Sequence, residues 1–385
     1  MKFLVYSWIY EYTLFDILDA FNDLNIQYSI VKLDVIEKNK SDCPELYDLI
    51  YSSIPKDNYD AVFSINYFPD VAKACNDRDI LYISWSYDCP LDIANVEKTI
   101  SLPTNRAFFF DKDQYKQYLN DNNTVFHAPL GVNSKRLKNI SFNPKYASEI
   151  SFVGRVYHSS YPTIKKFLDD YCIGYLDGLI NTQKMVYGAY LIKGALSDEV
   201  MEQINTDLKK HNSPFTQKEK VTIDQIATSL AMEATFENRL LYLGLLSKKF
   251  DLRWYTTPDS ESLPHIKKCD PVDYKTQMPQ VFNSSKINLH IGLHAISSGI
   301  SLRQLDIMAC GGFLLSSFQP ELFDYFTPGE DFDYYSSVEE AYEKCVFYLN
   351  NEALRAQIAL SGKEKVLECF DNKIILSEII NTAFN

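Results

Sequence analysis

Residues 301–315, SLRQLDIMACGGFLL, place an arginine and an aspartate three positions apart in an otherwise apolar segment. Ser301 followed by Gln304 has the spacing of a capping box, which predicts that a helix begins there. Arg303 and Asp306 then share one face of that helix. The preceding sequence HAISSGI has small residues in four of its seven positions, one of them a glycine, so its backbone N–H groups can approach a ligand closely.

This arrangement could bind a diphosphate and a ribose. The N-terminus of a helix carries partial positive charge and N–H groups without intrahelical partners, which suit phosphate oxygens. An acidic side chain further along the helix, here Asp306, can accept hydrogen bonds from ribose hydroxyls. A second interpretation stays open on these residues alone, in which Arg303 and Asp306 form an ion pair on a half-exposed helix.

Two series of alternating strands and helices must position these residues. Strands are predicted at 2–8, 27–34, 59–66, 80–88, 106–111 and 123–133. A polar connector at 133–148 follows, and further strands are predicted at 149–155, 250–256, 287–293 and 312–317. Apolar strands that alternate with helices indicate parallel sheets covered on both faces.

Helical patterns predominate between and after the later strands. Residues 160–248 are predicted to be mostly helical, and residues 337–370 are predicted to be helical with a break at Asn350 and Asn351. A last helix is predicted at 371–385. The sequence therefore predicts an α/β protein with two doubly wound domains.

Composition agrees with two soluble domains. The chain has 385 residues, of which 46% are apolar and 23% charged. The formal net charge of −13 argues against broad binding to nucleic acid, which needs a concentrated basic face. Eight cysteines without a CxxC pair, no secretory segment at the start and no apolar run of about 18 residues lead us to expect a cytoplasmic protein with reduced thiols.

The second half of the chain resembles a known enzyme family. Residues 287–370 are similar to the C-terminal domain of CgeB-like glycosyltransferases, which are related to the family 4 enzymes with the GT-B fold. The shared features are an arginine and an acidic residue three apart, then Ala-x-Gly-Gly, a strand, and PELF followed by PG before a helix. The first half resembles the accompanying domain in YDAVFSINYFPDVAKACNDRDILYISWSYDCPLD, FFFDKDQY and HAPLGVN. The helical region 160–248 has no counterpart.

The resemblance implies a GT-B fold, in which two Rossmann-like domains face a central cleft. The first domain, 1–145, would bind the acceptor, and the second, 146–370, would bind the nucleotide sugar. Residues 160–248 would be a helical insertion in the second domain. The helix at 371–385 would pack back on the first domain.

The resemblance also implies a donor site in the second domain. Asp306 would hold the ribose of the donor, and Arg303 and the loop of Gly299, Ile300 and Ser301 would lie near its diphosphate. In SFVGRVY, Gly154 and Arg155 end the first strand of this domain. A guanidinium there can pair with phosphate oxygens and neutralise the leaving group, although a solvated loop arginine is the alternative.

Four further residues are assigned to the predicted donor site on weaker grounds. Arg239 is a weaker diphosphate candidate, because an arginine on a helix surface needs no function. His290 and His294 would line the pocket, since they lead into the glycine loop. Many family 4 enzymes carry an acidic residue eight positions before the ribose-binding one, where it contacts the donor sugar. Ser298 stands at that position here, which leaves the sugar and the stereochemistry open.

The acceptor side is predicted to involve polar residues at strand ends in the first domain, where α/β sheets place ligand groups. Asp88 is the first candidate for a general base that deprotonates an acceptor hydroxyl, with an Asx turn as the structural alternative. His127 is a rival base, although a lone histidine is more often structural. Trp85 could stack against a sugar, and Asn66 could orient the acceptor or a loop.

No metal is expected. The sequence DKD at 111–113 matches the Asp-x-Asp of metal-dependent GT-A enzymes, but Asp111 is explained more simply as the N-cap of the next helix. His290 and His294 are four apart, yet Gly292 and the strand-like flanking residues argue against a zinc site. We therefore expect neither a metal nor another cofactor, with arginines and a helix dipole stabilising the diphosphate.

Together, these interpretations predict a metal-independent hexosyl- or deoxyhexosyltransferase. Its donor would be a nucleotide-diphosphate sugar, with UDP- and dTDP-sugars favoured, and its acceptor a hydroxyl of a bacterial surface glycan, a lipid-linked glycan or a protein such as flagellin. Other glycosyltransferases of the same pathway are expected partners. Two alternatives stay open: a nucleotide-sugar epimerase, and an inactive subunit that pairs with a glycosyltransferase, which Ser298 favours.

Overall fold

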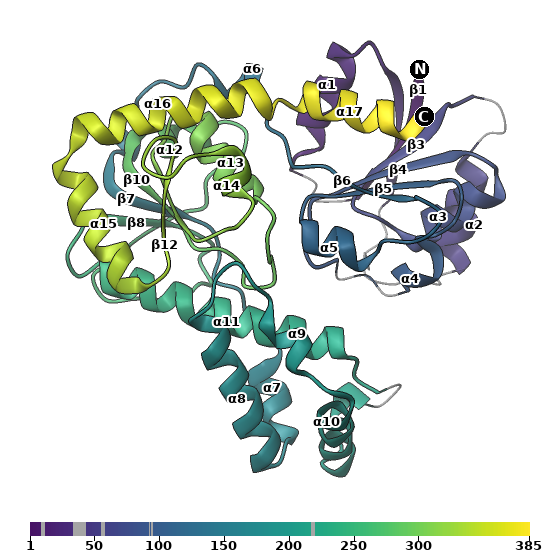
Figure 1. Ribbon diagram of the computed structural model, residues 1–385, viewed down its shortest axis with the longest axis horizontal. Coiled ribbons are helices and arrows are strands. Elements are labelled where there is room, and N and C mark those ends of the chain that lie inside the picture. The colour runs from purple at the N-terminus through teal and green to yellow at the C-terminus, as the bar shows by residue number, and fades with distance from the viewer. Residues whose placement is uncertain (9–11, 34–43, 55–57, 92, 94, 217–219) are drawn as a thin grey trace. The chain divides into compact units, whose positions relative to one another are not determined.

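The computed structural model describes residues 1–385 except 9–11, 34–43, 55–57, 92, 94 and 217–219. The chain forms two compact units (Figure 1). Unit 1 consists of 1–139, 299–309 and 364–385, and unit 2 of 140–298 and 310–363. Each unit contains one parallel six-stranded sheet, so the predicted α/β fold with two doubly wound sheets is confirmed.

The sheet of unit 1 has the strand order β2-β1-β3-β4-β5-β6. Its strands are β1 (Lys2–Trp8), β2 (Gln27–Leu33), β3 (Ala61–Ile65), β4 (Leu81–Ser86), β5 (Asn105–Phe109) and β6 (Val125–His127). Every strand predicted in the first domain is present. Four of them gave the clearest sequence signal: β3, β4 and most of β1 and β5 are buried on both faces, and their sequences are therefore continuous apolar runs.

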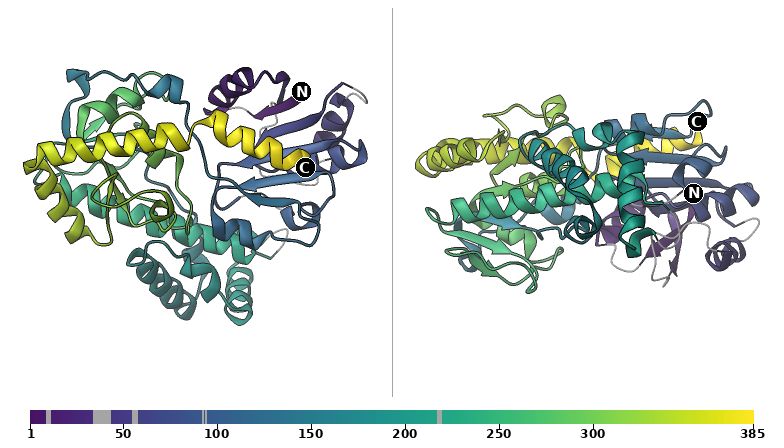
Figure 2. Two further views of the ribbon diagram at one scale, coloured as in Figure 1. Left: turned by 45° about the horizontal axis from the view of Figure 1, so that its top comes forward. Right: turned by 90° about the horizontal axis from the view of Figure 1, so that it is seen from below.

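Helices cover both faces of this sheet. One face packs against α2 (Pro44–Ser53), α3 (Pro69–Asp77) and α4 (Val96–Thr99), and Tyr115 of α5 (Lys112–Gln117) joins the same apolar cluster. The other face packs against α1 (Leu14–Asp23) and α17 (Asn372–Phe384), which lie side by side (Figures 1 and 2). There the Phe3 ring lies 5.5 Å from Phe21 and 6.2 Å from Phe384.

The sheet of unit 2 has the order β12-β11-β10-β7-β8-β9. Its strands are β7 (Ser148–Val153), β8 (Leu252–Tyr255), β9 (Lys267–Cys269), β10 (Ser285–His290), β11 (Leu314–Ser317) and β12 (Asp333–Tyr335). The edge strands β9 and β12 were not predicted. Each has only three residues, which is too short to show a periodic pattern.

The predicted helical region 160–248 is present as a separate layer of unit 2. It contains α7 (Tyr161–Ile164), α8 (Asp170–Lys184), α9 (Leu191–Ala195), α10 (Asp198–Lys210) and α11 (Ile223–Leu246), with short 3₁₀ helices at Lys165–Phe167 and Pro214–Thr216. These helices share their own apolar core, which includes Leu176, Ile204 and Leu230. The C-terminal half of α11 leaves this core and packs on the sheet through Leu243 and Leu246.

The remaining helices connect the strands of the two units. They are α6 (Ser134–Leu137), α12 (Met278–Ser284), α13 (Leu302–Ala309), α14 (Leu322–Tyr325), α15 (Val338–Asn350) and α16 (Glu352–Cys369), with a 3₁₀ helix at Pro144–Tyr146. The predicted break at Asn350 and Asn351 separates α15 from α16. The sequence placed residues 299–309 in the second domain, whereas in the structure they belong to unit 1, where α13 packs against α6.

Candidate functional site

Asn66 and Asp88, both predicted from strand ends, are directly connected in unit 1. Asn66 follows β3 with a φ of 66°, a left-handed conformation that asparagine tolerates. Its Oδ1 accepts hydrogen bonds from the backbone N–H groups of Tyr87 (2.8 Å) and Asp88 (3.0 Å), and its Nδ2 donates to Asp88 Oδ2 at 2.6 Å. Asn66 therefore holds the loop after β4 and presents the Asp88 carboxylate, which is exposed.

The two other predicted acceptor-side residues differ from this pair. Trp85 has no exposed surface, so the prediction that it stacks on a sugar is wrong; both faces of β4 are covered. His127 is half-buried, and its Nε2 lies 3.2 Å from the Phe110 carbonyl oxygen. This contact supports a structural role for His127, and its role as a base stays a prediction.

Asp111 is the N-cap of α5, as predicted. Its Oδ1 accepts hydrogen bonds from the N–H groups of Asp113 (3.0 Å) and Gln114 (2.8 Å), and its Oδ2 accepts one from Gly299 N–H (2.9 Å). Both oxygens of the Asp111 carboxylate therefore accept hydrogen bonds from backbone N–H groups. The capping contacts were predicted from the sequence, but the contact with Gly299 was not. Within the described ranges, no group of three or more histidine, cysteine, aspartate or glutamate side chains is placed to hold a metal ion.

Gly299 must be glycine because its backbone approaches this cap closely. A Cβ atom at position 299 would lie 2.7 Å from the Phe110 ring and 2.8 Å from the Asp111 Cα atom. Such distances are shorter than real Cβ contacts, so the glycine allows the loop before α13 to pack against the start of α5. The adjacent Ile300 is also buried.

The helix α13 begins at the predicted position. Ser301 N–H donates to Gln304 Oε1 at 2.8 Å, the side-chain-to-backbone contact of a capping box. Arg303 Nη1 lies 3.9 Å from Asp306 Oδ2, so the two residues form the i,i+3 pair of the structural interpretation. Asp306 is only 1% exposed, and its role at a ribose stays a prediction.

Buried charges in unit 1 gather near Tyr87. Burial and the nearby Asp16 and Asp306 carboxylates raise the pKa of Tyr87 well above its usual value. Asp16 of α1 is paired with Arg136 of α6 through Nε to Oδ1 (3.1 Å) and Nη2 to Oδ2 (2.7 Å). Sequence reasoning missed this bidentate pair, because the partners are 120 positions apart and neither belongs to a recognisable motif.

In unit 2, side chains connect the ends of β10 and β11. His290 is buried, and its Nδ1 lies 3.1 Å from Ser316 Oγ. Gly292 N–H donates to Ser317 Oγ at 3.0 Å. The predicted pocket residue His290 thus helps to fix the loop that follows β10.

Ser298 lies further along the same loop and contacts a residue that sequence reasoning missed. Ser298 Oγ donates to Glu321 Oε1 at 2.6 Å, and the Glu321 N–H donates to the Ser298 carbonyl oxygen at 3.0 Å. Both side chains are buried. The PELF motif that contains Glu321 is one of the features shared with the family, but nothing in the sequence relates it to Ser298.

Arg239 corrects the prediction of a surface arginine on a helix. It is 7% exposed, because its side of α11 faces the sheet. Its Nε and Nη2 donate to the Ile291 carbonyl oxygen at 3.2 and 2.7 Å, and its Nη1 donates to the Arg155 carbonyl oxygen. Arg239 therefore holds the chain after β7 and after β10, whereas Arg155 itself is exposed and the preceding Gly154 is half-buried.

His294 is held as a neutral imidazole. Asn238 Nδ2 donates to its Nε2 at 2.8 Å, and its ring stacks on Tyr187 at 4.9 Å between centroids. Burial, and secondly the Arg239 charge, lower the pKa of His294 to about 4. A neutral, buried histidine is a structural part of this loop at neutral pH.

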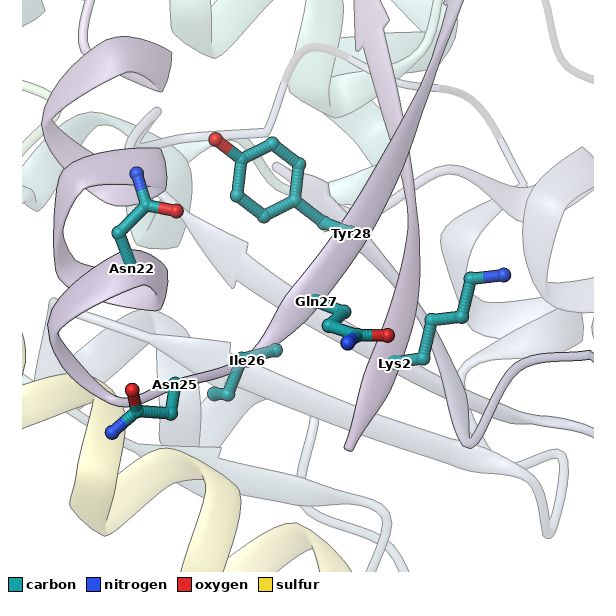
Figure 3. A pocket seen from close by; sticks show the side chains of 6 residues that line it. All are labelled: Lys2, Asn22, Asn25, Ile26, Gln27 and Tyr28. Carbon is teal, nitrogen blue, oxygen red and sulfur yellow. The ribbon is translucent and has the colours of Figure 1, made fainter.

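An open groove of about 620 Å³ lies elsewhere on unit 1 (Figure 3). It is lined by residues of β1, α1 and β2 and of the turn between the last two, namely Lys2, Asn22, Asn25, Ile26, Gln27 and Tyr28. Lys2 and Gln27 are the first residues of their strands. The groove is therefore at the amino ends of the strands, whereas Asn66 and Asp88 follow their carboxyl ends.

Comparisons with solved structures identify the fold. A glycosyltransferase from Rickettsia africae aligns with a TM-score of 0.55 and 10% identity, over 99% of this chain and 97% of its own. HepE from Anabaena, in complex with UDP and glucose, aligns with a TM-score of 0.53 and 10% identity over 99% of both chains. Sucrose-phosphate synthase from Thermosynechococcus elongatus gives 0.57 and 9% identity, over 100% of this chain and 99% of its own.

The fold is GT-B. This GT-B chain also matches the family described as glycosyl transferase-like over residues 232–381. The match contains the loop after β10 and all of α13. No curated protein sequence was found to be similar. Among the described residues of the GT-B chain, no helix has the length and apolar character that crossing a membrane requires.

Proposed function

We propose that this protein is a hexosyl- or deoxyhexosyltransferase that uses a nucleotide-diphosphate sugar. The observation that carries the proposal is the glycosyl transferase-like match of residues 232–381, because this segment contains the predicted donor residues from Arg239 to Asp306. The GT-B fold supports it. UDP- and dTDP-sugars are the favoured donors, and the UDP bound to HepE, which has the same fold, supports the first of these.

On the donor side, Arg155 is the proposed contact to the diphosphate. It is exposed and follows β7, and Gly154 before it lets a ligand approach the backbone. Its guanidinium can pair with two phosphate oxygens and neutralise the charge of the departing nucleotide. Arg303 and the N-terminus of α13 supply further positive charge. Ribose binding by Asp306 requires neighbouring side chains to move, since the carboxylate is buried.

On the acceptor side, Asp88 is the proposed general base. The acceptor hydroxyl gives its proton to the Asp88 carboxylate, its oxygen forms a bond to the anomeric carbon, and the bond between that carbon and the diphosphate oxygen breaks. The hydrogen bond that Asn66 Nδ2 donates to Asp88 Oδ2 fixes the direction of the carboxylate, which reduces the entropy cost of reaching the reactive arrangement. No metal is required, because arginine and backbone N–H groups bear the diphosphate charge.

The proposed acceptor is a hydroxyl of a bacterial surface glycan, a lipid-linked glycan or a protein, with the reaction in the cytoplasm. Other glycosyltransferases of the same pathway are the proposed partners. The two alternatives predict different results in a turnover assay. An epimerase would convert the nucleotide sugar to its epimer with no acceptor present, and an inactive subunit would convert nothing.

The first test is a thermal-shift screen against UDP, dTDP, GDP and their sugars. A ligand at about 100 times its dissociation constant stabilises the folded protein by roughly 2.7 kcal/mol, which is readily detected. We expect a UDP- or dTDP-sugar to give the largest shift. If no nucleotide or nucleotide sugar stabilises the protein, the proposed function is wrong.

The second test uses the donor from that screen in a turnover assay. Asp88→Asn removes the base and is expected to slow transfer roughly 100-fold or more while donor affinity is kept. Asp121→Asn, the same change at an exposed aspartate, is the matched control and should keep full activity. If Asp88→Asn transfers the sugar at the full rate, Asp88 is not the base. A separate assay in EDTA tests the metal-free mechanism, which would be contradicted if activity is lost and then restored by Mg²⁺ or Mn²⁺.

A further inference from the structure

The groove on unit 1 is built around the end of helix α1. This helix ends in a Schellman motif, in which Asn25 N–H donates to the Asn22 carbonyl oxygen at 3.1 Å and Ile26 N–H donates to the Phe21 carbonyl oxygen at 2.9 Å. Asn25 has the left-handed conformation that the motif requires, with a φ of 56°. Backbone hydrogen bonds therefore hold the turn from which several of the lining side chains extend.

The side chains around the groove are rich in hydrogen-bonding groups. Asn22, Asn25 and Gln27 line it and are exposed, and each amide can both donate and accept hydrogen bonds. Figure 3 shows the Asn22 amide on α1 opposite the Tyr28 hydroxyl on β2. A sugar hydroxyl also donates and accepts, so this set of groups is complementary to a ligand with several hydroxyls.

The groove also offers apolar surface. Ile26 lines it and is 7% exposed. The half-buried ring of Tyr28 packs beside Phe21, with 6.2 Å between the ring centroids, and part of it stays open to a ligand. A sugar ring has apolar C–H faces and a polar edge, so it can place a face against Tyr28 or Ile26 while its hydroxyls reach the amides.

The charges around the groove disfavour an anion. Lys2 is the one charged residue among the six that line it, and its Nζ lies 4.7 Å from the centre of the Tyr59 ring, within the range of a cation–π contact. The C-terminal end of α1 lies at the groove, and such an end carries partial negative charge. A neutral ligand therefore fits the groove better than a phosphate or a carboxylate does.

The groove is separate from the predicted base. It lies at the amino ends of β1 and β2, whereas Asp88 follows the carboxyl end of β4 in the same parallel sheet. The seven residues of β1 extend over about 20 Å at roughly 3.3 Å per residue. A ligand in the groove is thus about the length of a strand away from the carboxyl edge.

We propose that this groove binds a neutral part of the acceptor glycan, several sugar units away from the reacting hydroxyl. Its volume of about 620 Å³ is within the usual range of ligand sites. Binding there keeps the acceptor at the protein and raises its effective concentration, without a part in the chemical step. The inference rests on the proposed function and adds to it a second binding site, at the edge of the sheet opposite Asp88.

The test measures oligosaccharide binding by saturation-transfer NMR titration. Maltohexaose, cellohexaose and chitohexaose are the neutral probes, and hexagalacturonate is the anionic one. UDP is present at a saturating concentration, so that the sugars do not compete for the donor site. We expect at least one neutral hexasaccharide to bind with a dissociation constant on the order of 1 mM, because an open groove buries only part of its ligand. Hexagalacturonate should bind more weakly.

Two variants locate the binding. Asn22→Ala and Asn25→Gly each remove one amide and should weaken binding roughly fivefold, the effect of about one hydrogen bond. Glycine at position 25 keeps the left-handed turn. Asn212→Gly is the matched control, because Asn212 has a φ of 53° in the same motif after α10, where Ser213 N–H donates to the Leu208 carbonyl oxygen at 2.8 Å. This control should bind the sugar like the wild type.

The results separate the two proposals. The inference is overturned if no neutral hexasaccharide binds at up to about 10 mM, or if Asn22→Ala and Asn25→Gly bind as tightly as the wild type. Binding of only hexagalacturonate, or of only a neutral glycine–serine hexapeptide, also overturns it. In each of these cases nucleotide binding in the thermal-shift screen leaves the proposed function intact. If a hexasaccharide binds in the groove but no nucleotide stabilises the protein, the glycan site is confirmed and the proposed function is contradicted.

Discussion

His294 is expected to make the stability of unit 2 depend on pH. In the folded protein its pKa is about 4, because the ring is buried and lies near the Arg239 charge. In the unfolded chain the ring returns to the ordinary value of about 6.5. Between these values the unfolded chain binds more protons than the folded one. The contribution is therefore fully present above about pH 6.5 and is lost progressively as the pH falls toward 4.

The two pKa values give the size of the effect. A difference of about 2.5 units corresponds to roughly 3 kcal/mol when the pH has fallen below both values. Lowering the pH from about 7.5 to about 5.5 crosses only the upper part of this range and should reduce the free energy of unfolding by about 1 kcal/mol through His294 alone. Other groups also titrate, so the measurement must be a difference between variants.

The assay is chemical denaturation of the wild type and of His294→Gln at several pH values between about 7.5 and 5.5. Glutamine keeps an oxygen that can accept from Asn238 but does not titrate, so the variant is expected to lose less stability on acidification by about 1 kcal/mol. His158→Gln, at an exposed histidine, is the control and should follow the wild type. If His294→Gln shows the same pH dependence as the wild type, the neutral buried imidazole is refuted.

Three further changes test the packing. Gly299→Ala places a Cβ atom 2.7 Å from the Phe110 ring, and we expect a loss of about 1–3 kcal/mol in denaturant unfolding; an unchanged midpoint would contradict the close approach. Gly178→Ala in α8 has no atom within 4 Å of the new Cβ, so it should raise stability by about 0.5–1 kcal/mol, and a loss would show hidden crowding. Arg136→Met leaves the Asp16 carboxylate buried without its guanidinium partner, which should lower the free energy of unfolding by about 3 kcal/mol in the same measurement. A loss below about 1 kcal/mol would mean that the ion pair is not desolvated.

Much of the fold could be predicted from the sequence because local signals agree with the tertiary structure. In unit 1, β3, β4 and most of β1 and β5 are buried and therefore appear as short apolar runs, as in AVFSI of β3. Asp111 lies between a strand and a helix, and its side chain caps α5 by accepting hydrogen bonds from the N–H groups of Asp113 and Gln114. Asn350 and Asn351 mark a helix break that depends on neighbouring residues alone.

The parts that could not be predicted depend on contacts distant in sequence. Arg239 looks like a surface residue in its own helix, and only the packing of α11 on the sheet buries it. Trp85 and Asp88 are three positions apart in the sequence. Trp85 belongs to the buried strand β4 and cannot contact a ligand, whereas Asp88 follows the strand and is exposed. The partner of Ser298 is 23 positions away, in a segment brought close by the parallel pairing of β10 and β11.

The order of segments in unit 1 has a consequence for protein synthesis. Its sheet is made first, but the unit also contains residues 299–309 and 364–385. At a ribosomal rate of about 5–20 residues per second, roughly ten to fifty seconds separate the last strand of this sheet from the helix that covers Phe3. During that interval one face of the sheet lacks α17 and exposes aromatic side chains. Unit 1 can therefore complete its packing only after all of unit 2 has been synthesised.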